Sequence, residues 1–137
     1  MRTTSQAVRL RIVKTASGTP AANVRVGMKS DYDRATTSTE QDNHHRRNWE
    51  ESPWEYGTTN DDGIVDLTIE EIMLDRNSGA NPSNDRDLTN TEQILSIGDG
   101  SPEKIHLLLN VNAVGQGTYY SATVEKITKP KYVDTQN

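Results

Sequence analysis

Three aromatic side chains lie within eight residues of one polar segment, in a chain whose residues are only 5% aromatic. They are Trp49, Trp54 and Tyr56, and the charged residues Arg47 and Glu50 lie beside them. Flat aromatic faces stack on sugar rings, and charged neighbours exchange hydrogen bonds with sugar hydroxyls. We hypothesise that these five residues form a ligand-binding surface. The commoner alternative is that the rings pack beneath the segment and enlarge a small core.

Two adjacent histidines, His44 and His45, precede Arg46 and Arg47 in the same segment. Neighbouring residues of an extended segment point in opposite directions, so these imidazoles do not readily bind one ion. A solvated loop of mixed charge is the favoured interpretation, and no metal site is predicted. His106 is expected to face solvent from a strand.

A second polar segment is rich in Asp and Asn, whose side-chain oxygens can bind Ca²⁺, and it also contains a glycine. These residues are Asp75, Asn77, Gly79, Asn81, Asn84, Asp85 and Asp87. The calcium-loop pattern requires glycine where Ala80 stands here, and the same composition is typical of turns. Turns are therefore expected, and no cofactor is predicted.

Alternation of apolar and polar residues every two positions predicts the strands that hold these segments. Five strands are predicted, over residues 8–14, 23–30, 64–70, 104–114 and 118–128, with a short sixth at 54–58. The first two are expected to pair around a turn at Gly18, and the last two to form a hairpin around residues 115–117. A turn at residues 60–63 precedes the strand at 64–70.

Two long connections separate these strands, over residues 31–57 and 72–103, and both exceed the usual length of structureless loops. They either contain unrecognised elements or carry function. Residues 90–95 have the pattern of a capped short helix. The segment 130–137 is polar and is expected to form a flexible tail.

Composition is consistent with a single domain over residues 1–137. Only 31% of residues are hydrophobic and none is Phe, so a thin aliphatic core is expected. A net charge of −5 disfavours nucleic-acid binding, which needs a basic surface. No apolar run is long enough to span a membrane, and the first residues lack the apolar centre of a signal peptide. The chain contains no cysteine, which leaves the compartment open, and a trimmed exported precursor would suit the same sequence.

Two phrases carry a resemblance to a known family: TASGTPAANVRV at residues 15–26 and TTNDDGIVDL at 58–67. They resemble the transthyretin-like (prealbumin-like) group, which includes hydroxyisourate hydrolases, carboxypeptidase regulatory domains and collagen-adhesin B-type repeats. The resemblance implies an all-β, immunoglobulin-like antiparallel β-sandwich of about seven strands, with the two long loops between them. It covers about half of the chain.

The catalytic and crosslinking residues of that group are not matched. The hydrolases place a catalytic His seven residues before the turn Gly, where this chain has Arg11, and their C-terminal tetrapeptide is missing. Ring hydrolysis needs a base that titrates near neutrality, which arginine is not. The lysine of the isopeptide crosslink is replaced by Ile12, and the last predicted strand contains no Asn. No catalytic residue is predicted.

Together these observations predict a non-catalytic binding or structural accessory module of a secreted or cell-surface system, with a glycan or another protein as its partner. Two alternatives stay open at this point. One is a diverged enzyme of the hydroxyisourate-hydrolase type with relocated catalytic groups. The other is an adaptor subunit that pairs with proteins through exposed edge strands. The oligomeric state is not predicted.

Overall fold

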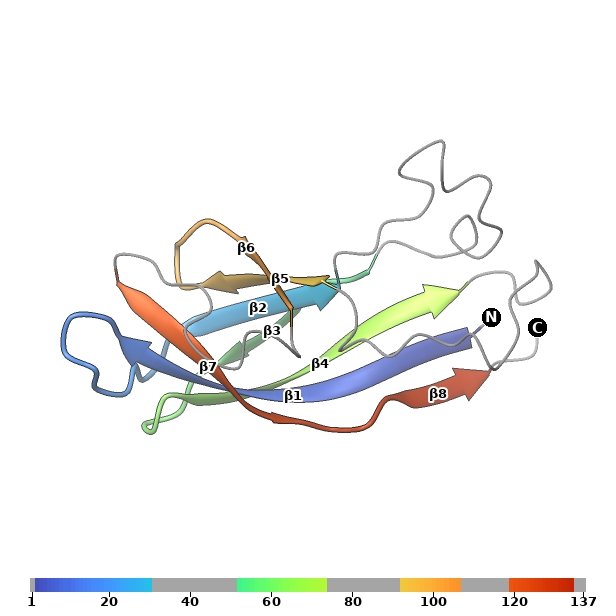
Figure 1. The fold of residues 1–137 in the computed structure, drawn as a ribbon, viewed down its shortest axis with the longest axis horizontal. Coiled ribbons are helices and arrows are strands. Elements are labelled where there is room, and N and C mark those ends of the chain that lie inside the picture. Colours follow the sequence, from blue (N-terminus) through green and yellow to red (C-terminus); the bar gives the residue numbers. More distant parts are fainter. Residues whose placement is uncertain (1, 31–51, 74–91, 107–118, 135–137) are drawn as a thin grey trace.

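Two antiparallel sheets face each other in the protein, which is all-β in its described part (Figure 1). The structure is a computed structural model that describes residues 2–30, 52–73, 92–106 and 119–134. Eight strands lie in these residues and no helix does. The predicted all-β, two-sheet architecture is confirmed at this level.

The first sheet is built around the long strand β1 (Arg2–Lys14). Strand β4 (Ile64–Met73) pairs with one edge of β1. Along the other edge, β7 (Tyr120–Ile127) pairs with Val8–Lys14 and β8 (Lys131–Asp134) pairs with Arg2–Ser5. Because β7 and β8 follow each other along the same edge, the eight strands occupy seven positions.

The second sheet has β2 (Arg25–Ser30) between β3 (Glu55–Thr58) and β5 (Glu92–Ile97). Strand β6 (Glu103–His106) pairs with the far side of β5. Among the described residues, the short strand β3 therefore forms one edge of this sheet. In the register of β2 with β3, Gly27 lies opposite Tyr56. This pairing positions the aromatic side chain of Tyr56 over β2.

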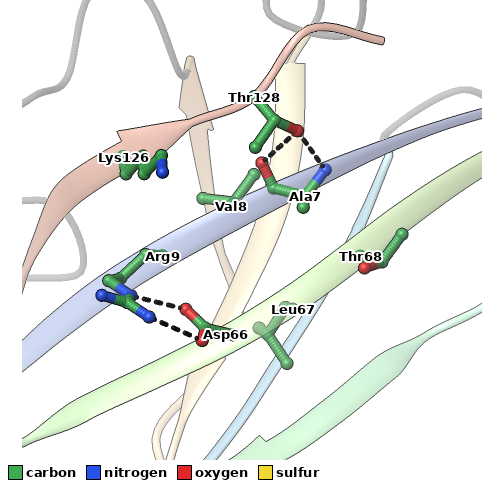
Figure 2. Close-up of a pocket in the computed structure, with 8 residues that line it drawn as sticks. All are labelled: Ala7, Val8, Arg9, Asp66, Leu67, Thr68, Lys126 and Thr128. Atoms are coloured by element: carbon green, nitrogen blue, oxygen red, sulfur yellow. Dashed lines mark hydrogen bonds and ion pairs between the residues drawn. The ribbon is translucent and has the colours of Figure 1, made fainter. Parts of the chain in front are cut away.

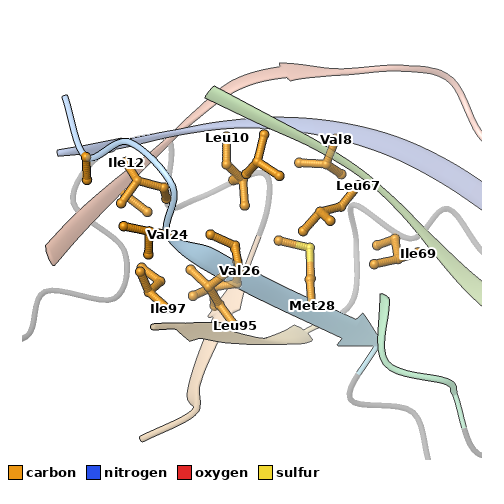
Figure 3. Packing of buried hydrophobic residues seen from close by; sticks show 14 residues of the cluster. Val8, Leu10, Ile12, Val24, Val26, Met28, Leu67, Ile69, Leu95 and Ile97 are labelled. Atoms are coloured by element: carbon orange, nitrogen blue, oxygen red, sulfur yellow. The ribbon is translucent and has the colours of Figure 1, made fainter. Parts of the chain in front are cut away.

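The core fills the space between the sheets with aliphatic side chains (Figure 3). Where the side chains of β1, β2, β4 and β5 are described, every second residue points inward, as the period-two patterns predict. The predicted inward residues of these strands, and of the position just before β2, are confirmed as buried: Val8, Leu10, Ile12, Val24, Val26, Met28, Val65, Leu67 and Ile69. Full burial of such a side chain contributes about 1.5–3 kcal/mol, so these rows hold the two sheets together.

A turn at one end of the sandwich joins the two phrases that carry the family resemblance. Gly63 has φ 77°, and the Asn60 side chain accepts hydrogen bonds from the amides of Asp62 and Ile64 at 2.9 and 3.0 Å. The amide of Ile12 donates to the carbonyl of Gly63 at 2.7 Å. The predicted turn at residues 60–63 is thus confirmed, and it is bonded to β1.

The buried hydroxyl of Thr59 makes a second connection at this end. It donates to the carbonyl of Ala21 at 2.6 Å and accepts from the amide of Val24 at 2.9 Å. Residues 58–67 therefore contact residues 15–26 directly, although the two phrases lie far apart in the sequence.

The predicted pairing of the first two strands is wrong, whereas most of the first strand of the predicted hairpin, residues 107–114, lies outside the described residues. Strands β1 and β2 lie in opposite sheets, and so do β6 and β7, which pair with β5 and β1 respectively. Alternation identifies the face that a strand buries, but strands from opposite sheets bury the same kind of face. The predicted hairpin turn at residues 115–117 lies outside the described residues.

Further differences concern segments between the predicted strands. Residues 92–97 form strand β5 where a short helix is predicted, because Gln93, Leu95 and Ile97 are buried at a period of two. The predicted loop 72–103 therefore contains an element. Strand β8 lies within the segment predicted as a flexible tail, where it pairs with the start of β1.

Candidate ligand-binding surface

Trp54 and Tyr56 lie together on the outer face of the second sheet. Tyr56 belongs to the edge strand β3 and Trp54 directly precedes it. Their ring centroids are 5.9 Å apart with an angle of 20° between the planes, which is a stacked arrangement. The Tyr56 side chain is 52% exposed, Trp54 is half-buried, and neither belongs to the core cluster. The two rings therefore do not enlarge the core between the sheets.

Gly27 provides the room for this ring pair. It lies on β2 opposite Tyr56 of β3, and a side chain at this position would point at the Tyr56 ring. A Cβ atom at this position would lie 2.6 Å from Cε1 of Tyr56 and 3.3 Å from Cε3 of Trp54. The rings thus lie against the backbone of β2, which holds them close to the rigid sheet.

Two cations from β2 approach the ring pair. Cζ of Arg25 lies 4.0 Å from the centroid of the Tyr56 ring, and Nζ of Lys29 lies 5.3 Å from the Trp54 ring. Both distances are typical of cation–π contacts. Arg25 and Lys29 are two positions away from Gly27 in opposite directions, so the cations lie at opposite ends of the pair. We call Arg25, Tyr56, Trp54 and Lys29 the aromatic–cationic stack.

Sequence reasoning identified half of this stack. The hypothesis named Trp54 and Tyr56, whereas its other residues, Arg47, Trp49 and Glu50, lie outside the described residues. Arg25 and Lys29 were missed because their partners depend on the pairing of β2 with β3. The available signal was Gly27, since glycine inside an apolar strand often marks the close approach of another group.

A second surface is an open depression of about 260 Å³ on the outer face of the first sheet (Figure 2). Arg9 donates two hydrogen bonds to the Asp66 carboxylate, at 2.8 and 3.0 Å. The amide of Ala7 donates to Oγ1 of Thr128 at 3.1 Å. The depression is lined by Ala7, Val8, Arg9, Asp66, Leu67, Thr68, Lys126 and Thr128.

A bulge in β7 shapes the neighbourhood of this depression. Arg9 pairs with Lys126 but Leu10 pairs with Val124, which leaves Glu125 as the extra residue. Both Glu125 and Lys126 are exposed as a result. Oε1 of Glu125 then accepts hydrogen bonds from Nη2 and Nε of Arg11 at 3.0 and 3.2 Å.

Electrostatics in the depression favour binding over acid–base chemistry. The hydrogen bonds from Arg9 lower the pKa of the Asp66 carboxyl below its ordinary value, and Asp66 in turn raises the pKa of Arg9. Asp66 is therefore ionised near neutrality and unsuited to exchange protons there. Both groups are largely exposed, so water screens the pair.

Metal-binding hypotheses find no support in the described part of the chain, where no three His, Asp or Glu side chains gather around a point that would hold an ion. His44, His45 and the oxygen-rich residues 75–87 lie outside that part. His106 lies in β6, but its side chain is outside the described part. Within the same residues, no helix is long and apolar enough to cross a membrane.

No protein-family model, curated protein or solved structure matches the chain. The geometry of the two surfaces is therefore the basis for a functional proposal.

Proposed function

We propose that this chain is a non-catalytic binding module that recognises a glycan through the aromatic–cationic stack. The observation that carries the proposal is the stacked pair of Trp54 and Tyr56, which lies on the outer face of a sheet instead of in the core. The Tyr56 ring is 52% exposed beside the half-buried Trp54, and a ligand that covers this apolar surface removes it from water. Their composition suits the apolar faces and hydroxyl groups of a sugar.

The arrangement also limits the entropy that a ligand must overcome. Tyr56 is confined between the Gly27 backbone, the Trp54 ring and the Arg25 guanidinium. Side chains already held in one conformation lose little freedom on binding, so more of the contact energy appears as affinity. Arg25 adds hydrogen-bond donors beside the Tyr56 ring.

The absence of catalysis is part of the proposal and rests on the chemistry of particular residues. Arg11, at the position of the hydrolase histidine, is ion-paired with Glu125 at 3.0 Å. A permanently charged guanidinium cannot accept a proton from water. Asp66 is held ionised by Arg9, so its carboxylate is a weak base at neutral pH. A diverged hydroxyisourate hydrolase is accordingly the less favoured alternative.

For the finer fold, we propose membership of the transthyretin-like sandwiches. Support comes from the two sequence phrases, which contact each other through Thr59 and the Gly63 turn. In immunoglobulin constant-type domains the first two strands share a sheet, whereas β1 and β2 lie in opposite sheets here. An accessory role in a secreted or cell-surface system belongs to the same proposal.

A protein partner on the same surface is the second candidate. Trp, Tyr and Arg are the residues that dominate binding energy at protein interfaces, and the stack contains one of each. Strand β3, at the edge of its sheet in the described residues, also offers a strand for pairing by an adaptor. Glycan binding is favoured because the exposed Tyr56 ring lies beside the N–H groups of Arg25, which combines an apolar surface with hydrogen-bond donors.

Tryptophan fluorescence during titration with a panel of oligosaccharides tests the proposal. At least one glycan is expected to give a saturable change in emission, and Tyr56→Ala and Trp54→Phe are expected to weaken that binding. Tyr119→Ala is the matched control, because Tyr119 is 74% exposed and lies outside the stack. Melting temperatures of all variants are compared with that of the wild type.

An absence of any response across the panel would refute glycan binding. Equal losses of affinity in Tyr119→Ala and Tyr56→Ala would show that the stack is not the site. Capture of the glycan by all variants with unchanged affinity would lead to the same conclusion.

A further inference from the structure

We propose that the glycan is acidic and that Arg25 binds its carboxylate or sulfate groups. This inference rests on the proposed function of the stack and specifies the class of ligand. It concerns the chemistry of one guanidinium, which the exposed ring of Tyr56 holds in place.

Arg25 differs from the other arginines whose side chains are described. Arg9 is paired with Asp66 and Arg11 with Glu125, both at the outer face of the first sheet. Arg25 makes no ion pair with any described residue, and its side-chain contact is the Tyr56 ring at 4.0 Å. An exposed guanidinium without a carboxylate partner is free to bind one from a ligand.

Stacking on the ring makes Arg25 a better receptor than a mobile surface arginine. A guanidinium that lies over an aromatic ring still directs its N–H groups outward in its own plane. Two of these groups match the two oxygens of a carboxylate or sulfate, which gives parallel charge-assisted hydrogen bonds. The Tyr56 ring fixes the guanidinium in advance, so binding costs less side-chain entropy.

The position of the cation favours an extended ligand. Arg25 and Lys29 are four residues apart on β2, which corresponds to about 13 Å along a strand. The two rings lie between them. A polysaccharide with repeated acidic groups can contact Arg25 while its sugar rings pack against Tyr56 and Trp54.

Overall charge would not supply this affinity. The chain carries a net charge of −5, so a polyanion is repelled at long range and must gain its binding energy from local contacts. If Arg25 recognises the acidic glycan, the glycan is expected to bind at the aromatic–cationic stack and not at the surface around Arg9. The exposed but paired Arg9 provides an internal comparison.

Matched polysaccharides separate the acidic group from the sugar. Dextran sulfate and dextran share a backbone and differ in sulfate, polygalacturonate supplies carboxylates, and polyglutamate supplies carboxylates without sugar. Binding of each to the full chain is measured by isothermal titration calorimetry at fixed ionic strength. Dextran sulfate or polygalacturonate is expected to bind more tightly than dextran, and whichever is tighter identifies the preferred acid.

Variants of two arginines test the role of Arg25. Arg25→Gln is expected to reduce affinity for the acidic glycan about tenfold to hundredfold, the range for losing charged hydrogen bonds. Arg25→Lys keeps the charge but loses the planar fork, so an intermediate affinity is expected. Arg9→Gln is expected to bind as the wild type does. Melting temperatures confirm that each variant is folded.

Several results would overturn the inference, and they are distinguishable from failure of the proposed function. Equal affinity for dextran and dextran sulfate, lost in Tyr56→Ala but not in Arg25→Gln, would preserve glycan binding and refute the acidic class. Equal losses in Arg25→Gln and Arg9→Gln would indicate unspecific charge attraction. Polyglutamate binding as tight as that of the acidic glycans would indicate an acidic protein partner. If no polysaccharide binds, both proposals fail.

Discussion

Replacing Gly63 with alanine is expected to destabilise the sandwich strongly, because both its backbone conformation and its surroundings require glycine. Its φ of 77° lies in the left-handed region. A Cβ atom there would overlap the carbonyl oxygen of Ile12 and would lie 3.2 Å from the amide nitrogen of Ala21. These neighbours are backbone atoms of β1 and of the turn after it, so they cannot simply rotate away.

The magnitude follows from three contributions. A non-glycine residue in the left-handed region costs about 1–2 kcal/mol. Moving the Ile12 carbonyl weakens the hydrogen bonds Ile12 N–H to Gly63 O and Ala21 N–H to Ile12 O, at 2.7 and 3.0 Å. Each is worth about 0.5–1.5 kcal/mol. The sum is about 2–5 kcal/mol, a large part of the ~5–15 kcal/mol stability of a typical domain.

Gly18→Ala is the matched control. Gly18 has a similar φ of 71°, but no atom lies within 4 Å of the place that a methyl group would occupy there. Only the conformational cost of about 1–2 kcal/mol is therefore expected. Urea denaturation followed by circular dichroism gives the free energy of unfolding of both variants. If Gly63→Ala is no less stable than Gly18→Ala, the turn does not pack against β1 as described.

Two further predictions concern the candidate surfaces. Gly27→Ala is expected to displace the Tyr56 ring, since the new Cβ would lie 2.6 Å from Cε1 of that ring. Glycan affinity should therefore fall. Because the ring is exposed, the free energy of unfolding should change by only about 1 kcal/mol. Unchanged affinity would contradict the stack. NMR titration should give Asp66 a pKa below the ordinary value, and Arg9→Gln should raise it. The stability of the wild type over Asp66→Asn should be present above about pH 4 and lost as pH falls through the folded pKa; a pH-independent difference would refute the ion pair.

The faces of the main strands could be predicted from the sequence because burial leaves a direct period-two signature. Val8, Leu10 and Ile12 alternate with polar residues, and all three are buried. The turn at Gly63 could be predicted equally well, since its Asn, Asp and Gly residues have specific conformational preferences. Both signals are local, so a single sequence contains them.

Pairing could not be predicted in the same way, because it depends on contacts between distant segments. The pattern of β2 is the same whether it pairs with β1 or faces it across the core. Polar core positions were also hidden: Thr4 and Gln6 are buried on β1, where their polarity gave no sign of an inward face. Oγ1 of Thr4 and Oε1 of Gln6 have no hydrogen-bond partner among the described residues.

The candidate site shows the same division between local and distant information. Trp54 and Tyr56 were identifiable from their rarity and spacing. The position of Arg25 at the end of the ring pair follows only from the register of β2 with β3. When a surface is formed by two strands, the sequence of one strand predicts only the residues that this strand contributes.

Mapping the changes in the protein's NMR chemical shifts on glycan binding tests the location of the site most directly. A ¹⁵N-labelled sample of the full chain is titrated with the acidic polysaccharide that binds most tightly in calorimetry. The largest amide shifts are expected in β2 and β3, with the Trp54 indole N–H and the Arg25 side chain among them. Shifts centred on the depression of the first sheet, around Ala7 and Thr68, would contradict the assignment of binding to the aromatic–cationic stack.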